Sequence, residues 1–188
     1  DLCSLLRPDQ VADAVVAGDA LVNRPWADGT RLPPRTTASR LSAALERAGR
    51  FKGVRVARAA LALIRVGADS PPETRLRLAL LDAGLPEPRL QAQLVSPAGE
   101  RTDADMVVER SRVALHYDGG HHRTPEQQRR DARRDRLWQE AGHLSITVMG
   151  ADLAEDFRTV VAAVVRHDRA VRATSTTSGP APQQDFRT

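Results

Sequence analysis

Apolar residues in the first third of the chain recur at the spacing of an α-helix. They stand three or four positions apart within 11–16, 41–48 and 56–66, as on one buried helix face. Glycine and proline residues interrupt these stretches and separate the predicted helices. Because this part carries no cluster of chemically active side chains, residues 1–69 are predicted to form a helical lead-in or linker module.

From residue 70 the pattern predicts strands between capped helices. The sequence Ser-Pro-Pro-Glu at 70–73 is typical of a helix start, with serine as N-cap, proline in the first turn and glutamate closing a capping box. Short apolar segments at 89–95, 103–108 and 112–117 then predict three strands joined by turns. A second structural region therefore begins at this helix.

Two more helices and a strand complete the second region. A second capping pattern predicts a helix over 124–142, which is followed by a strand at 144–149 and a closing helix over 152–169. The order of elements predicts an α/β domain over 70–172, with a sheet flanked by helices. Over 173–188 the Thr, Ser, Gly, Pro and Gln residues predict a disordered tail.

Composition narrows the class of protein without choosing a function. The chain has 188 residues and no apolar run close to the roughly 20 residues that span a bilayer, so no membrane partner is expected. The single cysteine, Cys3, excludes an internal disulfide framework, and the cytoplasm is the predicted compartment. The chain starts at Asp1 without a signal-peptide pattern, so we expect a piece of a longer protein or one that lacks its own start.

The net charge of +4 favours an anionic partner. Lys52 is the only lysine among the 28 basic side chains, a ratio typical of codon bias in a GC-rich genome. Bias of this kind would place many arginines on a solvated surface. Where the arginines cluster is therefore more informative than how many there are.

The predicted helix from residue 124 is rich in arginine. The candidate nucleic-acid-binding residues are Arg129, Arg130, Arg133 and Arg134 in this helix and Arg123 just ahead of it. Basic helices of this kind can lie along a phosphate backbone, or they can be solvated faces with Asp–Arg pairs at helical spacing. Aromatic residues make up only 3% of the chain, which argues against base stacking on single strands and favours duplex DNA.

The acids and imidazoles that could carry chemistry lie on two predicted strands. Asp105 stands near the start of the strand at 103–108, and His116 and Asp118 stand at the end of the next. Such side chains on rigid neighbouring strands could hold a divalent ion that activates water for phosphodiester hydrolysis. Alternatively, Asp118 is a turn residue before Gly119 and Asp105 is a solvent-facing acid.

Histidines and a helix acid add further candidates. His116, His121 and His122 lie within seven residues and could ligate a metal or transfer protons, or could contact solvent or phosphate in a polar loop. Glu73 could serve the capping box, an active site, or both if the start of its helix faces the sheet.

A series of short motifs runs in order along the second region. The motifs are Ser70-Pro-Pro-Glu73-Thr-Arg-Leu-Arg77, Gly84-Leu-Pro-Glu-Pro88, Asp105, Tyr117-Asp118-Gly119 with His122-Arg123, Asp131-Ala-Arg-Arg134, and Ala141-Gly142 ahead of Asp152-Leu153. In this order they resemble the actinobacterial endonuclease-like proteins related to the very-short-patch-repair endonucleases. These belong to the PD-(D/E)XK restriction-endonuclease-like superfamily.

The resemblance implies a restriction-endonuclease-like mixed four-stranded sheet with helices on both faces, preceded by a helical segment. It also implies a divalent-metal site (Mg²⁺ or Mn²⁺) at one sheet edge that acts on DNA. In such proteins a winged-helix DNA-binding segment of the antitoxin type often comes first, and here it would lie upstream of residue 1. The roles implied are Asp105 as metal carboxylate, Asp118 as second active-site group, Glu73 as helix acid, His122 at the leaving group or phosphate, and Asp131 with Arg134 as supporting pair.

The chain departs from the family pattern in three places, one of which is His143, where an aromatic residue usually follows the Ala-Gly step. Members usually carry glutamate directly before the Tyr-Asp-Gly step, where this chain has His116, and the superfamily lysine has no counterpart. An imidazole favours a softer metal than Mg²⁺, or no metal. The sequence therefore predicts a metal-dependent DNA endonuclease or, as the alternative, a catalytically degenerate DNA-binding or regulatory module of a toxin–antitoxin or defence system. A weaker alternative is an α/β interaction domain without nucleic acid.

Overall fold

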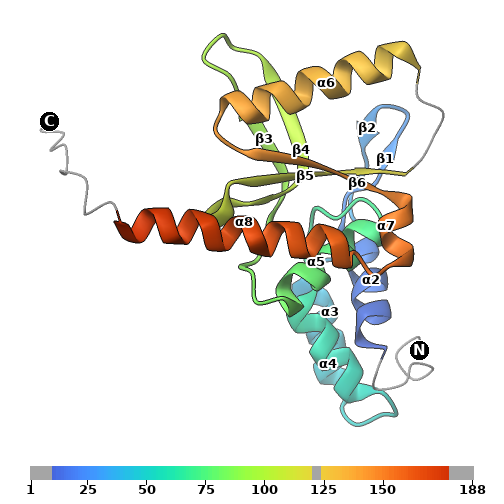
Figure 1. Ribbon diagram of the computed structural model, residues 1–188. Helices are drawn as coiled ribbons and strands as arrows, with labels where there is room; N and C mark the ends of the chain where they lie inside the picture. The colour runs from blue at the N-terminus through green and yellow to red at the C-terminus, as the bar shows by residue number, and fades with distance from the viewer. Residues whose placement is uncertain (1–9, 120–123, 178–188) are drawn as a thin grey trace, which may run out of the picture.

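The structure of this protein, a computed structural model, describes residues 10–119 and 124–177. A helical N-terminal part is followed by a four-stranded mixed sheet with helices on both faces (Figure 1). The predicted α/β class and mixed four-stranded sheet are therefore confirmed. Within the described ranges, no helix combines the length and apolar character that crossing a bilayer requires.

The N-terminal part contains the helices that the apolar spacing predicts. They are α2 (Val11–Val22), α3 (Ala38–Ala48) and α4 (Val54–Leu63). The helices pack on one another and bury small apolar side chains such as Val15, Val56 and Ala60. Their packing agrees with a helical segment ahead of the sheet.

The pattern of apolar residues does not reveal a short hairpin between α2 and α3. It consists of β1 (Trp26–Ala27) and β2 (Thr30–Arg31), which pair antiparallel. Asp28 and Gly29 form the turn with φ of 49° and 74°, the left-handed backbone that a two-residue hairpin turn requires. Strands of two residues are too short to show alternation, so only the Asp-Gly pair indicated them.

The central sheet has the strand order β3-β4-β5-β6. Its strands are β3 (Arg89–Val95), β4 (Arg101–Val108), β5 (Val113–Asp118) and β6 (Leu144–Met149). The first three are antiparallel neighbours, whereas β6 runs parallel to β5 and follows it through α6 (Pro125–Glu140). The strands predicted at 89–95 and 144–149 have the observed bounds, and the other two differ by one or two residues at an end.

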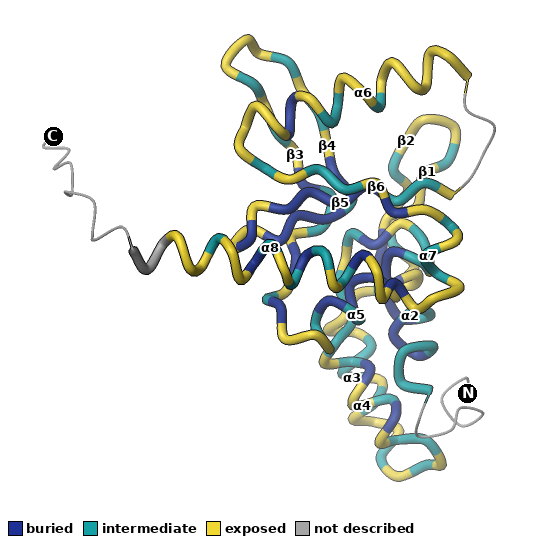
Figure 2. The backbone as a smooth tube through the Cα atoms, viewed as in Figure 1, coloured by how far each residue is buried: buried dark blue, intermediate teal, exposed yellow. Residues whose placement is uncertain are grey.

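Helices cover both faces of this sheet. On one face α5 (Pro71–Asp82) and α8 (Arg158–Thr177) enclose a core that includes Met106. On the other face α6 packs Trp138 against Ala104. The two middle strands, β4 and β5, are largely buried, as the dark tube in Figure 2 shows, whereas β3 and β6 are mostly half-buried or exposed.

The closing helix predicted over 152–169 is in fact two helices. α7 (Gly150–Ala154) ends before Asp156 and Phe157, whose φ values of 50° and 56° are left-handed, and α8 begins after them. The break places the Phe157 ring in the core under the sheet. A periodicity argument misses this break because neither residue is a glycine.

The last helix is longer than predicted at its C-terminal end. It runs to Thr177, into the tail predicted from residue 173. The hydroxyl of Thr174 donates to the carbonyl oxygens of Ala170 and Val171 at 3.3 and 2.8 Å, so this threonine is accommodated within the helix. The rest of the predicted tail, 178–188, lies outside the described residues.

A buried ion pair joins the helical segment to the α/β part. The guanidinium of Arg77 in α5 donates to Asp19 in α2 at 3.1 Å and to the Leu63 carbonyl oxygen at 2.7 Å. The side chains of Arg77 and Asp19 are 0% and 1% exposed. Arg77 also reaches Glu87 at 2.9 Å, so the linkage runs from the helical segment to the start of the sheet.

Candidate functional site

The start of α5 holds the first candidate, Glu73. Ser70 is the N-cap as predicted, and its hydroxyl oxygen accepts the Glu73 N–H at 3.4 Å. The Glu73 carboxylate accepts from the Ser70 hydroxyl at 2.7 Å and from the Asp69 N–H at 2.9 Å, so it reaches the residue before the N-cap. The Ser70 N-cap is therefore confirmed, but the predicted capping box is not formed, because the Glu73 carboxylate accepts from the Asp69 N–H and the Ser70 hydroxyl and not from the Ser70 N–H.

Burial and the charges of two other acids shift the pKa of Glu73. It is 5% exposed, and burial raises its pKa to about 7, although its hydrogen bonds to Ser70 and Asp69 oppose this rise. The negative charges of Asp105 and Asp69 contribute to this rise in pKa. The helix start therefore does face the strand that carries Asp105. We call Asp69, Glu73 and Asp105 the carboxylate cluster.

Asp105 lies where the alternation of side chains between the two faces of the sheet is interrupted in β4 and in its neighbour β3. Ala104 packs under α6, but Met106 packs under α5 and α8, although residues two apart in a strand normally share a face. Gln91, which stands opposite in β3, has a left-handed φ of 48°. The Asp105 carboxylate accepts the Tyr117 N–H at 2.6 Å, and burial raises its pKa. Asp105 is thus a half-buried acid and not a solvent-facing one.

His116 is buried between the sheet and α6. It is 3% exposed, its ring centroid lies 6.4 Å from that of Trp138, and its Nε2 lies 3.9 Å from Asp135 Oδ1. Nε2 has no hydrogen-bond partner among the described residues. Burial and, to a smaller extent, the charge of Arg134 lower the pKa of His116 to about 4, although the charge of Asp135 opposes this. The imidazole is therefore neutral at pH 7.

Arg134 connects α6 to these groups. Its guanidinium lies 3.1 Å from Asp131 and 3.7 Å from Asp135, so the predicted Asp131–Arg134 pair is present. Its positive charge acts on both Asp105 and His116. A fixed cation is thus part of the site.

A second guanidinium comes from the hairpin that the sequence pattern did not reveal. Arg31 in β2 donates to the two Asp69 carboxylate oxygens at 2.5 and 2.7 Å and to Gln91 Oε1 at 3.3 Å. It also stacks over the Trp26 ring, 4.7 Å from its centroid. Arg31, Asp69 and Gln91 are far apart in the chain, and no local pattern could have shown that they meet.

The remaining predicted site residues are not gathered into one metal-binding group. Asp118 ends β5 and pairs in register with Met149 of β6. Across residues 10–119 and 124–177, no three His, Cys, Asp or Glu side chains are placed to hold a metal ion. His122 and Arg123 lie outside the described residues, so their predicted roles stay predictions.

The donor atoms themselves do not fit a resident divalent ion. Both oxygens of Glu73 bond to its own helix start, one oxygen of Asp105 is bonded to Tyr117, and Nε2 of His116 faces Asp135. Hard divalent ions need several free oxygen ligands on one centre. Within the described part of the chain, these residues do not provide them.

The arginines of α6 border two grooves beside the turn between β3 and β4. One groove, of about 650 Å³, is lined by Arg129, Arg133 and Arg136. The other, of about 520 Å³, is lined by Arg101, Arg130, Arg133 and Arg134. We call them the arginine grooves.

Ion pairs neutralise some of these arginines and not others. Arg133 pairs with Glu100 at 2.5 Å, and Arg134 pairs with two aspartates of its own helix. Arg129, Arg130 and Arg136 are exposed and make no ion pair with any described residue. The alternative of a paired, solvated face therefore holds for only part of the helix.

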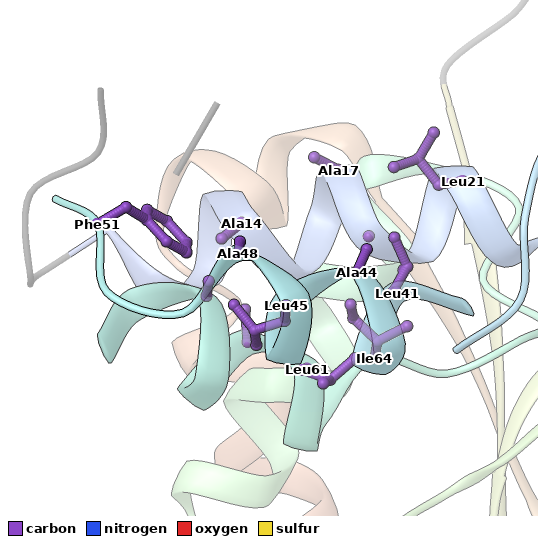
Figure 3. A pocket seen from close by; sticks show the side chains of 13 residues that line it. Ala14, Ala17, Leu21, Leu41, Ala44, Leu45, Ala48, Phe51, Leu61 and Ile64 are labelled. Carbon is purple, nitrogen blue, oxygen red and sulfur yellow. The ribbon is translucent and has the colours of Figure 1, made fainter. Parts of the chain in front are cut away.

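A third hollow is purely apolar. It has about 350 Å³ and lies between α2, α3 and α4, where Leu45, Phe51 and Leu61 are among its lining residues (Figure 3). Gly18 is required at its wall, because a Cβ there would lie 2.2 Å from the Ile64 side chain. None of the residues lining it is titratable or nucleophilic, so it carries no catalytic chemistry.

The fold and the site together define an α/β protein with a partly buried carboxylate cluster at the start of α5 and an arginine-rich helix, α6, on the other face of the sheet. No family model matches the chain. Two uncharacterized proteins of Mycobacterium tuberculosis, from strains CDC 1551 / Oshkosh and ATCC 25618 / H37Rv, are each 31% identical to it over 131 residues. The match covers 69% of this chain and 48% of each relative, so the chain spans about half the length of the curated relatives it matches. No solved structure matches the chain.

Proposed function

We propose that this chain binds duplex DNA through the arginine grooves and does not cleave it with the carboxylate cluster. The observation that carries the proposal is the set of exposed, unpaired guanidiniums of Arg129, Arg130 and Arg136 on one helix. Arginine presents a planar fork of donors that matches a phosphate group. Such contacts supply most of the affinity of sequence-independent DNA binding.

The spacing of these residues suits a phosphate backbone. Arg129 and Arg136 are seven positions apart, which is about 10 Å along a helix. That length corresponds to about three phosphate steps on one DNA strand. We therefore expect about three phosphate contacts from this helix.

We further propose that the sheet and its helices are the restriction-endonuclease-like fold that the sequence motifs resemble, in a form without metal-dependent catalysis. The engaged oxygens of Glu73 and Asp105 and the buried His116 support this proposal. A DNA-binding or regulatory module of a toxin–antitoxin or defence system is the role that fits it. Cleavage with Mg²⁺ or Mn²⁺ is the competing proposal, and it is favoured by the mutual repulsion of Glu73 and Asp105.

Removing the unpaired arginines is the test of DNA binding. We expect the triple variant R129Q/R130Q/R136Q to bind a fluorescent duplex in EDTA about tenfold or more weakly than the wild type, because three phosphate contacts are lost. Fluorescence anisotropy measures this change. The control R40Q/R47Q/R58Q removes the same charge from exposed positions of α3 and α4. Equal weakening in both triple variants would contradict the proposed surface.

Cleavage is tested separately with supercoiled plasmid. We expect no nicking by the wild type in Mg²⁺ or Mn²⁺, because both oxygens of Glu73 and one oxygen of Asp105 are already hydrogen-bonded. Gel electrophoresis over a time course measures this. Metal-dependent nicking that Asp105→Ala abolishes would establish the endonuclease instead.

A further inference from the structure

The hollow between α2, α3 and α4 is lined by one apolar stripe from each of the three helices. The stripes lie within 14–21, 41–48 and 57–64, and in each the lining residues stand at i, i+3, i+4 and i+7. This spacing is one face of a helix over about two turns, or about 10 Å. Phe51 lies at one end of the hollow and Leu21 at the other (Figure 3). We call this space the apolar hollow.

The three stripes do not fill the space between them. Alanine stands at six of the lining positions, and α3 has no fully buried residue although its stripe is apolar. The space that remains is about 350 Å³, and Leu21 at its end is 38% exposed. Helices pack by inserting rows of side chains between each other's rows. The apolar hollow is therefore shaped to accept the larger apolar side chains of a further helix.

The rim of the apolar hollow is basic. Residues 40–58 carry six basic side chains and one acid, Glu46, which already accepts from Ser42 of its own helix at 3.4 Å. The basic side chains are all exposed, and none makes an ion pair with any described residue. They are Arg40, Arg47, Arg50, Lys52, Arg55 and Arg58.

Three of these arginines stand beside the lining stripes. Arg40 and Arg47 are four and three positions from Ala44 in α3, so they are its neighbours on the helix surface. Arg58 is three positions from Leu61 in α4 and is placed in the same way. An unneutralised positive charge therefore borders the apolar hollow on two of its helices.

We propose that the apolar hollow binds an amphipathic helix of a partner protein, with apolar side chains in the hollow and acidic side chains toward the basic rim. A hollow suits a helix better than a membrane surface, because a membrane-bound face must insert its own apolar side chains into the lipid. Figure 1 shows α3 and α4 at the opposite end of the molecule from α6, so this site does not overlap the arginine grooves.

Two labelled peptides test this binding. Each is about 18 residues long, which is enough to form a helix, and has leucine at i, i+3, i+4 and i+7. The other positions hold alanine with glutamate in one peptide and alanine with lysine in the other. We expect the full chain to bind the glutamate peptide about tenfold or more tightly than the lysine peptide, because the rim is basic. Fluorescence anisotropy at low salt measures both affinities.

Substitutions then locate the site. We expect R40Q/R47Q/R58Q, which removes rim charge, and A44E, which adds an acid at an exposed lining position, each to weaken binding of the glutamate peptide about fivefold or more. The controls are R158Q/R166Q/R169Q, at exposed positions of α8, and A59E, at an exposed position of α4 outside the apolar hollow. Both should bind like the wild type. Circular dichroism checks that each variant folds.

Equal affinity of the wild type for the two peptides, or binding of neither, would overturn the proposal. So would a dimer in analytical ultracentrifugation that A44E dissociates, because a second copy of this chain would then fill the apolar hollow. Peptide binding that appears only in L5N/L6N would assign the hollow to the first residues of this chain. Binding to phosphatidylglycerol vesicles and not to the glutamate peptide would assign it to a membrane. None of these results depends on DNA binding.

Discussion

Replacing Arg77 with methionine is expected to lower the free energy of unfolding by about 3–5 kcal/mol, because it leaves the buried Asp19 carboxylate without its cation. Arg77 and Asp19 are fully buried, so solvent does not screen their interaction. The substitution also removes the hydrogen bond to Leu63 that ties the helical segment to α5. The expected loss is a large share of the stability of a domain of this size.

Urea unfolding followed by circular dichroism measures this loss. The control is Arg75→Met, which breaks the exposed ion pair with Asp13 and is expected to cost less than about 1 kcal/mol. The double variant with Asp19→Asn is expected to recover part of the loss, because no buried charge remains unpaired. Equal effects of the changes at 75 and 77 would refute the structural role of this pair.

The second large effect concerns pH. Burial lowers the pKa of His116 from 6.5 to about 4. The contribution of the neutral imidazole to the free energy of unfolding is therefore complete above about pH 6.5 and is lost as the pH falls through 4. That loss corresponds to about 3 kcal/mol. His116→Asn is expected to abolish it, because asparagine does not titrate.

Glu73 has the opposite dependence. Burial raises its pKa from 4.5 to about 7. The contribution of the protonated carboxyl to the free energy of unfolding is therefore complete below about pH 4.5 and is lost as the pH rises through 7. This loss also corresponds to about 3 kcal/mol. Between about pH 4.5 and 6.5 the two groups compensate in the wild type. We expect the stability of His116→Asn to fall with rising pH in this range and that of Glu73→Gln to rise.

Urea unfolding of the three proteins at several pH values tests both signs. The wild type is expected to give the flattest profile, with the two variants diverging on either side of it. Glu126→Gln, an exposed acid on α6, is a suitable control and should follow the wild type. Parallel profiles for all proteins would show that neither group is shifted by its surroundings.

Features set by neighbouring residues could be predicted from the sequence. The Ser70 cap is present, and the Thr124–Gln127 capping box forms with both of its hydrogen bonds, because the partners are three residues apart. The β6 strand at 144–149 likewise matches its predicted bounds. Local spacing alone is enough for features of this kind.

Features that depend on distant contacts could not be predicted. Arg31 meets Asp69 across 38 residues, and Arg77 meets Asp19 across 58. No periodic pattern encodes such pairs, and the left-handed backbone of Gln91 has no glycine to signal it. The sequence could indicate which acids and imidazoles are present, but not that hydrogen bonds and guanidiniums already engage several of them.

The central claim is that the arginine grooves bind duplex DNA without a divalent ion. The most direct measurement is the affinity for a labelled duplex in EDTA over a series of salt concentrations. About three phosphate contacts predict a slope of about −3 in log affinity against log salt for the wild type, and a slope close to zero for R129Q/R130Q/R136Q. A wild-type affinity that disappears in EDTA, or a slope that the triple substitution leaves unchanged, would contradict the claim.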